Sequence, residues 1–180
     1  MTQIKIPKER VGALIGKTGE TKRWIERRTG VKMLVDSEEG DIELDVSKLD
    51  DPAMALVAPN IVKAIGRGFS PEHALELLDG GTVLEVLDVR DFVGKKPNHV
   101  SRVRARLIGT RGKTRRIMED LTETHISVFG NTVSVIGGSV QVSITMRAIE
   151  MLLEGAEHAT VYRFLERKRD FVRVAGMGFD

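Results

Sequence analysis

Cysteine is absent from the 180 residues of this chain, and aromatic residues make up only 4% of them. Without a thiol the chain can form no disulfide, no thiolate metal site and no cysteine nucleophile. The scarcity of aromatic rings argues against the stacking platforms that many single-strand binders use. Long apolar runs are missing as well: none approaches the roughly 18 residues of a membrane span, and Met1–Lys5 does not read as a secretory signal. We therefore expect a cytoplasmic protein with no membrane contact.

The net charge is only +2, so neither sign of charge is in large excess. The basic residues, however, are concentrated in two segments. The segment 95–116 holds nine Lys and Arg residues and no Asp or Glu. The segment 5–32 holds nine against three Glu residues, whereas 36–51 is almost purely acidic. Charge runs are often only solvated faces, so the position of these two segments in the fold decides their meaning.

An internal repeat divides the chain. Shifting the sequence by 93 residues places Leu14 on Leu107 and keeps the register without a gap for over twenty residues. The matched pairs include Ile15 with Ile108, Gly16 with Gly109, Gly19 with Gly112, Thr21 with Thr114, Arg23 with Arg116, Glu26 with Glu119, and Thr29 with Thr122. Two similar domains explain this pattern better than a solenoid, which needs at least three repeats. The Gly80-Gly81 pair is the natural junction, which predicts domains over 1–80 and 81–180.

Each half reads as an α+β unit in the order strand, helix, helix, strand, strand, helix, with one added C-terminal helix. In the first half we expect strands over 3–6, 31–35 and 41–46 and helices over 8–15, 20–29, 52–65 and 71–78. In the second half we expect strands over 83–89, 125–129 and 132–136 and helices over 98–107, 113–121, 140–154 and 157–169. On the helix 20–29 the pattern points Trp24 and Ile25 inward and Lys22, Arg23, Glu26 and Arg27 outward.

Two Gly-x-x-Gly segments, Gly16–Gly19 (the first loop) and Gly109–Gly112 (the second loop), each join two expected helices. Glycine lets a loop approach another chain closely, and the following helix directs its N–H groups and positive dipole end there. Such a loop can clamp a nucleic-acid backbone while about four bases lie in an adjoining groove. The candidate RNA-binding residues are Ile15, Gly16, Lys17, Thr18, Gly19, Lys22 and Arg23, and Ile108, Gly109, Thr110, Arg111, Gly112, Lys113, Arg115 and Arg116.

Both halves resemble the K homology (KH) family in its type I order. The resemblance is carried by Leu14-Ile15 with the first loop, Ile25, Thr29-Gly30 and Val31-Lys32-Met33 in one half, and by Ile108 with the second loop, Met118, Thr122 and Ile126 in the other. It implies two type I KH domains that bind single-stranded RNA. One departure recurs: the third residue after the loop, commonly apolar in the family, is Lys22 in one half and Arg115 in the other. A cation there suggests an extra phosphate contact in place of the usual floor of the base groove.

The segments Ile65–Ala74 and Gly112–Ile117, together with the paired units, are similar to a narrower group. This group is the partner-of-Nob-one family of tandem KH ribosome-assembly factors, in its short archaeal form. The resemblance implies binding near the 3′ end of the small-subunit rRNA during ribosome maturation, alongside other ribosome-assembly proteins.

Two other functions stay open. The segment Gly12–Thr18 approaches a P-loop, which would make the chain a nucleotide phosphohydrolase, but it has three residues between its glycines where a P-loop has four. The residues before Gly12 also show a helical pattern, whereas a P-loop must follow a buried strand. Alternatively, one KH unit serves as a scaffold for a protein partner.

The four histidines, His73, His99, His125 and His158, lie at no ligand spacing, so we expect no catalytic residue, no metal and no cofactor. Two of them, His73 and His158, hold matching places in the repeat, which favours a structural role at a helix start.

The charge around the two loops differs. Uninterrupted positive charge surrounds the second loop, whereas Glu20 directly follows the first. Because phosphate contacts supply most of the affinity in such interfaces, we expect the second loop to be the stronger RNA contact. The first loop is then a weaker contact or a docking surface.

Overall fold

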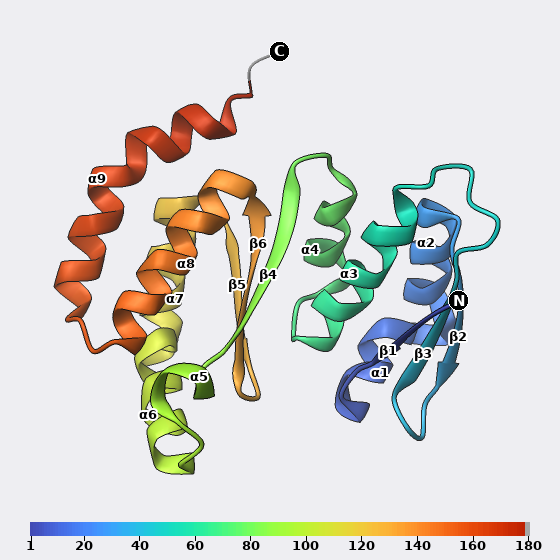
Figure 1. The fold of residues 1–180 in the computed structure, drawn as a ribbon, viewed down its shortest axis with the longest axis horizontal. Coiled ribbons are helices and arrows are strands. Elements are labelled where there is room, and N and C mark those ends of the chain that lie inside the picture. The colour runs from blue at the N-terminus through green and yellow to red at the C-terminus, as the bar shows by residue number, and fades with distance from the viewer. Residues whose placement is uncertain (179–180) are drawn as a thin grey trace. The chain divides into compact units, whose positions relative to one another are not determined.

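The computed structural model describes residues 1–178, which form two compact α+β units, Met1–Gly80 and the segment from Gly81 onward (Figure 1). The first unit contains β1 (Thr2–Lys5), α1 (Lys8–Ile15), η1 (Lys17–Gly19), α2 (Glu20–Thr29), β2 (Lys32–Asp36), β3 (Asp41–Asp45), α3 (Met54–Gly66), α4 (Pro71–Leu75) and η2 (Glu76–Leu78). The second contains β4 (Thr82–Asp88), α5 (Arg90–Val93), α6 (Pro97–Ile108), η3 (Thr110–Gly112), α7 (Lys113–Thr122), β5 (His125–Phe129), β6 (Thr132–Gly138), α8 (Ser139–Leu153) and α9 (His158–Gly176). Each η segment is a three-residue turn.

Each unit has a three-stranded antiparallel sheet with the strand that comes last in the sequence at its centre. The orders are β1-β3-β2 and β4-β6-β5. In β3 the apolar residues Ile42 and Leu44 alternate with acidic ones and are fully buried, so one face of this sheet carries the core. The strand β6 is buried along nearly its whole length. The expected β-α-α-β-β-α order with an added helix is therefore confirmed in both units.

Helices pack on the sheets through apolar residues, and Ile25 is buried as the helical pattern predicts, while Trp24 is half-buried. Leu14 of α1 and Ile25 of α2 are buried in the first unit, and their repeat partners Leu107 and Met118 are buried in the second. In the second unit α8 packs on β4 and β6, and α9 packs outside α7 and α8 (Figure 1). No helix within residues 1–178 is long and apolar enough to cross a membrane.

Most expected elements lie within two residues of their expected bounds, and the differences have local causes. The short helix α5 was not expected, and it ends at Gly94, which has a φ of 75°. The helix α9 continues to Gly176, well past the expected end near residue 169. It continues because Val172 is buried against the unit and its carbonyl accepts a hydrogen bond from Gln141 Nε2 at 3.3 Å.

A half-buried arginine closes the end of the long helix in each unit. Arg10 donates to the carbonyls of Ile65 and Phe69, both at 2.8 Å. In the second unit Arg106 donates to the carbonyls of Leu152, at 2.6 Å, and Ala156. These carbonyls stand at matching places, but the two arginines do not: Arg106 lies about one helical turn further along its helix than Arg10. Both side chains fix the turn that leads into the added helix.

Candidate nucleic-acid interface

The two Gly-x-x-Gly loops have the same backbone conformation. The first glycine has φ 73° and ψ 175° in Gly16 and φ 73° and ψ 174° in Gly109. The last glycine is left-handed, with φ 78° in Gly19 and 75° in Gly112, each with ψ 16°. Since all four φ angles lie in the region that favours glycine, the loop geometry depends on these residues. The sequence repeat is thus also a repeat of backbone geometry.

The first glycine of each loop lies directly against the helix that follows. A Cβ on Gly16 would come within 2.2 Å of Thr21 Oγ1, and one on Gly109 within 2.3 Å of Thr114 Oγ1. Contacts under about 3 Å are not tolerated by real Cβ atoms. Thr21 and Thr114 therefore occupy the space that a side chain on Gly16 or Gly109 would need. This close packing holds each loop against the start of the helix that follows, α2 or α7.

The third residue of each loop is a left-handed residue other than glycine, and an arginine holds its carbonyl. Thr18 has a φ of 52° and Arg111 a φ of 54°. Arg23 Nη1 donates to the Thr18 carbonyl at 2.9 Å, and Arg116 Nη2 donates to the Arg111 carbonyl at 2.8 Å. A left-handed residue other than glycine costs roughly 1–2 kcal/mol, which these bonds help to offset. The predicted phosphate ligands Arg23 and Arg116 thus have a second role, and both remain exposed with further donors.

A partly buried carboxylate joins the helix after each loop to the neighbouring strand. Glu26 Oε1 accepts the Met33 backbone N–H at 2.8 Å, and Glu119 Oε1 accepts the Ile126 backbone N–H at 2.8 Å. The expectation that Glu26 points outward is wrong, because its side chain is only 11% exposed. Helical periodicity missed this role, although Glu26 with Glu119 and Met33 with Ile126 share the same offset in the repeat. That shared offset was the available signal.

The environment of Glu26 favours its charged form. Burial by itself would raise the pKa of this carboxyl, but the hydrogen bonds from the Met33 N–H and from Lys22 hold the pKa below its ordinary value. Lys22 Nζ lies 3.0 Å from Glu26 Oε1. The charge of Lys22 is therefore already balanced within its own unit.

The recurrent cation after the loop is tied to the protein in both units. Lys22 pairs with Glu26, and its side chain is 30% exposed. Arg115, its counterpart, is half-buried and donates from Nη1 to the Ile126 carbonyl at 3.4 Å. These contacts place both side chains at the edge between the second helix and the neighbouring strand, where the base groove is expected. Their predicted contact with phosphate stays a prediction.

The remaining candidates lie at the tip of each loop. Lys17 and Thr18 are exposed in the first loop, as are Thr110 and Arg111 in the second, while Ile15 and Ile108 are half-buried at the ends of α1 and α6. The first residue of the helix after the loop differs in charge between the two units. It is the exposed Glu20 in α2 and the exposed Lys113 in α7. A cation beside a helix N-terminus attracts anions together with the dipole, whereas a carboxylate there competes with them.

The P-loop interpretation does not agree with the structure. Residues Gly12–Ile15 lie inside α1, which begins at Lys8, so a helix stands where a P-loop requires a strand.

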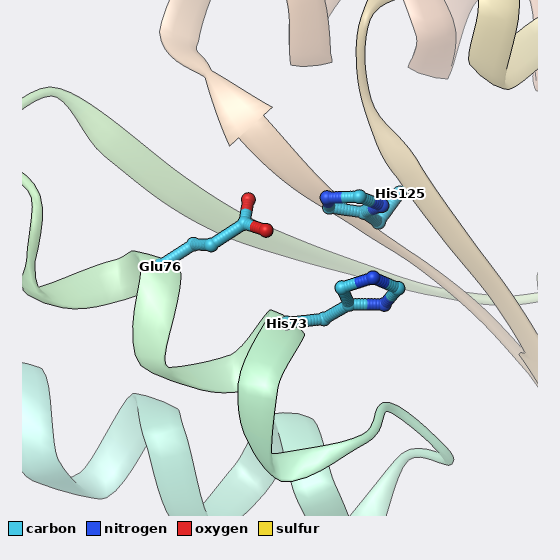
Figure 2. Close-up of side chains that lie close together, drawn as sticks. All are labelled: His73, Glu76 and His125. Atoms are coloured by element: carbon cyan, nitrogen blue, oxygen red, sulfur yellow. The ribbon is translucent and has the colours of Figure 1, made fainter.

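The histidines of the chain lie on separate elements of the fold. Figure 2 shows His73 on α4 and Glu76 at the start of η2, both in the first unit, and His125 at the start of β5 in the second. His158 begins α9 with its Nε2 2.9 Å from the Arg106 carbonyl oxygen, as expected for a structural histidine at a helix start.

Comparison with known protein families agrees with this geometry. Residues 83–170 match the eukaryotic-type KH domain (KH-domain type I), and residues 1–49 match the KH domain. A KH domain-containing protein of Methanocaldococcus jannaschii is 46% identical over 172 residues, which cover 96% of this chain and 75% of that protein. The pre-rRNA-processing protein PNO1 of Chaetomium thermophilum is 28% identical over 169 residues, 91% of this chain and 64% of its own length.

A solved structure shares the whole architecture. Dim2p of Pyrococcus horikoshii, in a crystal structure of a complex of a/eIF2alpha, aDim2p and rRNA, has 43% sequence identity and a TM-score of 0.88, over 94% of each chain. The chain therefore belongs to the archaeal family of tandem KH proteins similar to Dim2 and PNO1.

Proposed function

We propose that this chain binds single-stranded RNA without catalysing a reaction, and that its two Gly-x-x-Gly loops hold the RNA backbone. The observation that carries this proposal is the shared loop geometry: in both units a glycine packed on a threonine turns the chain into a helix N-terminus at an exposed tip. Backbone N–H groups at such a tip bind phosphate, and the close approach needs glycine. The chain uses no cofactor or metal in this role.

We further propose that the RNA is the small-subunit rRNA near its 3′ end, bound in the cytoplasm while the ribosome is maturing. The relatives support this choice, since one is a pre-rRNA-processing protein and another occurs in a crystal structure of a complex with rRNA and a/eIF2alpha. Other ribosome-assembly proteins are then the natural protein partners. RNA captured by crosslinking in cells is expected to map to that 3′ end, and a map dominated by other RNAs would overturn the choice of target.

The second loop is the main clamp in this proposal. Arg111 and Lys113 are exposed at its tip, and no acidic residue lies between Lys95 and Arg116. Phosphate contacts of this kind position the strand, while the groove beside α7 and β5 reads the bases. In the first unit Glu20 competes with phosphate, which leaves the first loop as a weaker contact or a docking surface for a protein.

A pair of matched double substitutions tests the ranking of the loops. Thr110→Asp with Arg111→Asp adds negative charge to the second loop, and Lys17→Asp with Thr18→Asp does the same to the first. Aspartate tolerates the left-handed conformation at Thr18 and Arg111, so both variants are expected to fold. We expect the second-loop variant to lose at least about tenfold in affinity for a single-stranded RNA, as for one lost charge-assisted contact of about 1.5 kcal/mol. The first-loop variant is expected to lose less.

Fluorescence anisotropy with a labelled oligonucleotide measures both losses, and thermal unfolding checks that each variant is folded. Equal losses would refute the ranking. No loss in either folded variant would refute the role of the loops altogether.

A further inference from the structure

A cavity of about 540 Å³ opens beside the second loop, on the side of α7 that packs against α9. Its walls come from α6, the second loop, the start of α7 and the first turns of α9. The lining residues are Arg102, Ala105, Arg106, Gly109, Thr110, Lys113, Thr114, His158 and Tyr162. The expected base groove is on the other side of α7, where Arg115 reaches the carbonyl of Ile126 in β5. The cavity is therefore separate from that groove, although both adjoin the same loop.

The aromatic wall of this cavity is connected to the loop. Tyr162 donates its hydroxyl to Thr114 Oγ1 at 3.1 Å, and Thr114 is the residue packed against Gly109. The ring of His158 lies beside that of Tyr162, with centroids 6.2 Å apart and planes inclined by 52°. The polar tips of both rings are bonded to the protein, through Thr114 and through the Arg106 carbonyl. Their ring surfaces, together with Ala105, give the cavity an apolar wall.

The rim of the cavity is cationic. Arg102 and Lys113 are both exposed, and no carboxylate is among the lining residues. Arg106 contributes a third positive charge, although its guanidinium is engaged with the end of α8. A cavity of this size with an apolar wall and a few charged groups matches a small-molecule or nucleotide site, which typically occupies ~300–1,000 Å³.

The first unit differs at the equivalent position. A cavity of about 290 Å³ lies beside α2, lined by Glu20, Thr21, Trp24, Arg27 and Glu72. Thr21 corresponds to Thr114, but Glu20 stands where the second unit has Lys113. Two carboxylates against one arginine repel a phosphate, so a phosphate-bearing ligand fits only the cavity of the second unit.

We propose that the cavity of the second unit holds one nucleotide of the RNA strand beyond those in the base groove. Its base packs against Tyr162 and His158, and its phosphate lies between Arg102 and Lys113. The strand passes from the groove across the second loop into the cavity. This inference rests on the proposed RNA-binding function, and it extends the site past the roughly four nucleotides that such a loop and groove hold.

Binding of oligonucleotides of different length tests the inference. A four-nucleotide RNA that fills the groove is compared with the same RNA extended by two nucleotides at its 5′ end or at its 3′ end. Because the clamp fixes the direction of the strand, only one extension reaches the cavity. We expect that extension to tighten binding by about fivefold or more, the effect of one stacked base.

Three variants locate the gain. Arg102→Gln and Tyr162→Leu are expected to abolish the gain from the extension. Arg102→Gln, which has no contact with the loop's supporting Thr114, is also expected to leave the affinity for the four-nucleotide RNA unchanged. Arg163→Gln removes the same charge from an exposed residue of α9 outside the cavity and is expected to keep the gain. Arg102 is exposed, so its variant stays informative even if Tyr162→Leu weakens the fold.

The outcomes separate this inference from the proposed function. No binding of any of the RNAs would refute the proposed function itself. Binding of the four-nucleotide RNA with no gain from either extension, or a gain that survives Arg102→Gln, would overturn the cavity proposal alone. Titration with a free nucleoside monophosphate distinguishes the source of the nucleotide: saturable binding lost in Arg102→Gln, without any gain from an extended RNA, would assign the cavity to a free nucleotide instead.

Discussion

At the scale of single residues, Glu26 and Glu119 show how a polar side chain on a helix can define a binding groove. Each accepts the backbone N–H of the neighbouring strand, at Met33 and at Ile126. The groove expected to read bases lies between this helix and this strand, so the carboxylate sets its width. A buried N–H left without an acceptor costs about 1–3 kcal/mol, which makes the carboxylate a structural requirement.

The lowered pKa of Glu26 makes this contribution dependent on pH. A carboxyl whose pKa is lower in the folded state stabilises the fold above its ordinary pKa, about 4.3, and the contribution is lost as the pH falls through the folded-state pKa. We expect Glu26→Gln to lower the free energy of unfolding of the first unit by about 1 kcal/mol at neutral pH. The difference from the original protein should shrink as the pH falls below that range.

Urea denaturation followed by the fluorescence of Trp24 measures this effect, because Trp24 is the single tryptophan and lies on the same helix as Glu26. Glu43→Gln serves as a control, since Glu43 is on β3 of the same unit and its Oε1 accepts a hydrogen bond from Gln3 Nε2 at the surface, at 3.0 Å. A difference for Glu26→Gln that stays constant from neutral to acid pH would contradict the role assigned to its ionised form.

At the scale of elements, the two glycines of one loop have different requirements. Gly109 is packed against Thr114, whereas a Cβ on Gly112 would meet no atom within 4 Å. Both have positive φ, so both share the roughly 1–2 kcal/mol cost of a left-handed residue. We therefore expect Gly109→Ala to lower the unfolding temperature of the second unit clearly more than Gly112→Ala. Thermal unfolding of the two single variants measures the difference, and equal shifts would mean that the packing on Thr114 contributes nothing.

The added helices differ more between the units than the repeated core does. In the first unit the added segment is short, covering α4 and η2, while in the second α9 runs from His158 to Gly176. In the second unit Tyr162, in the first turns of α9, contacts Thr114 and lines the cavity beside the second loop. The first unit has a smaller cavity beside α2 that is lined by Glu20 and Glu72, so the shared core carries cavities of opposite charge in the two units.

At the scale of the whole molecule, a net charge of +2 hides an uneven distribution. Exchanging the charges at one matched position tests whether this uneven distribution sets the contribution of each loop to RNA binding. Glu20→Lys gives the first unit the residue that the second has in Lys113, and Lys113→Glu does the reverse. Since each phosphate contact on a single strand contributes about 0.7 to the salt slope, Lys113→Glu should flatten the salt dependence of RNA affinity by about that amount.

Glu20→Lys should steepen the same salt dependence, provided that the first loop also contacts RNA. Affinities measured over a series of salt concentrations give both slopes. If Glu20→Lys leaves the slope unchanged while Lys113→Glu flattens it, the first loop is no RNA contact and a docking role for it is favoured.

The sequence by itself determined the α+β class, the two repeated halves and the positions of both loops. It could do so because Gly-x-x-Gly, proline and apolar periodicity act over a few residues, and because the repeat showed each signal twice. Only the tertiary structure decided the rest. Glu26 points inward because it accepts the backbone N–H of Met33, seven residues further along the chain. The helix α9 extends past residue 169 because Val172 is buried, and Tyr162 contacts Thr114, 48 residues away in the sequence. Such contacts depend on which surfaces the fold brings together, and no local pattern encodes that.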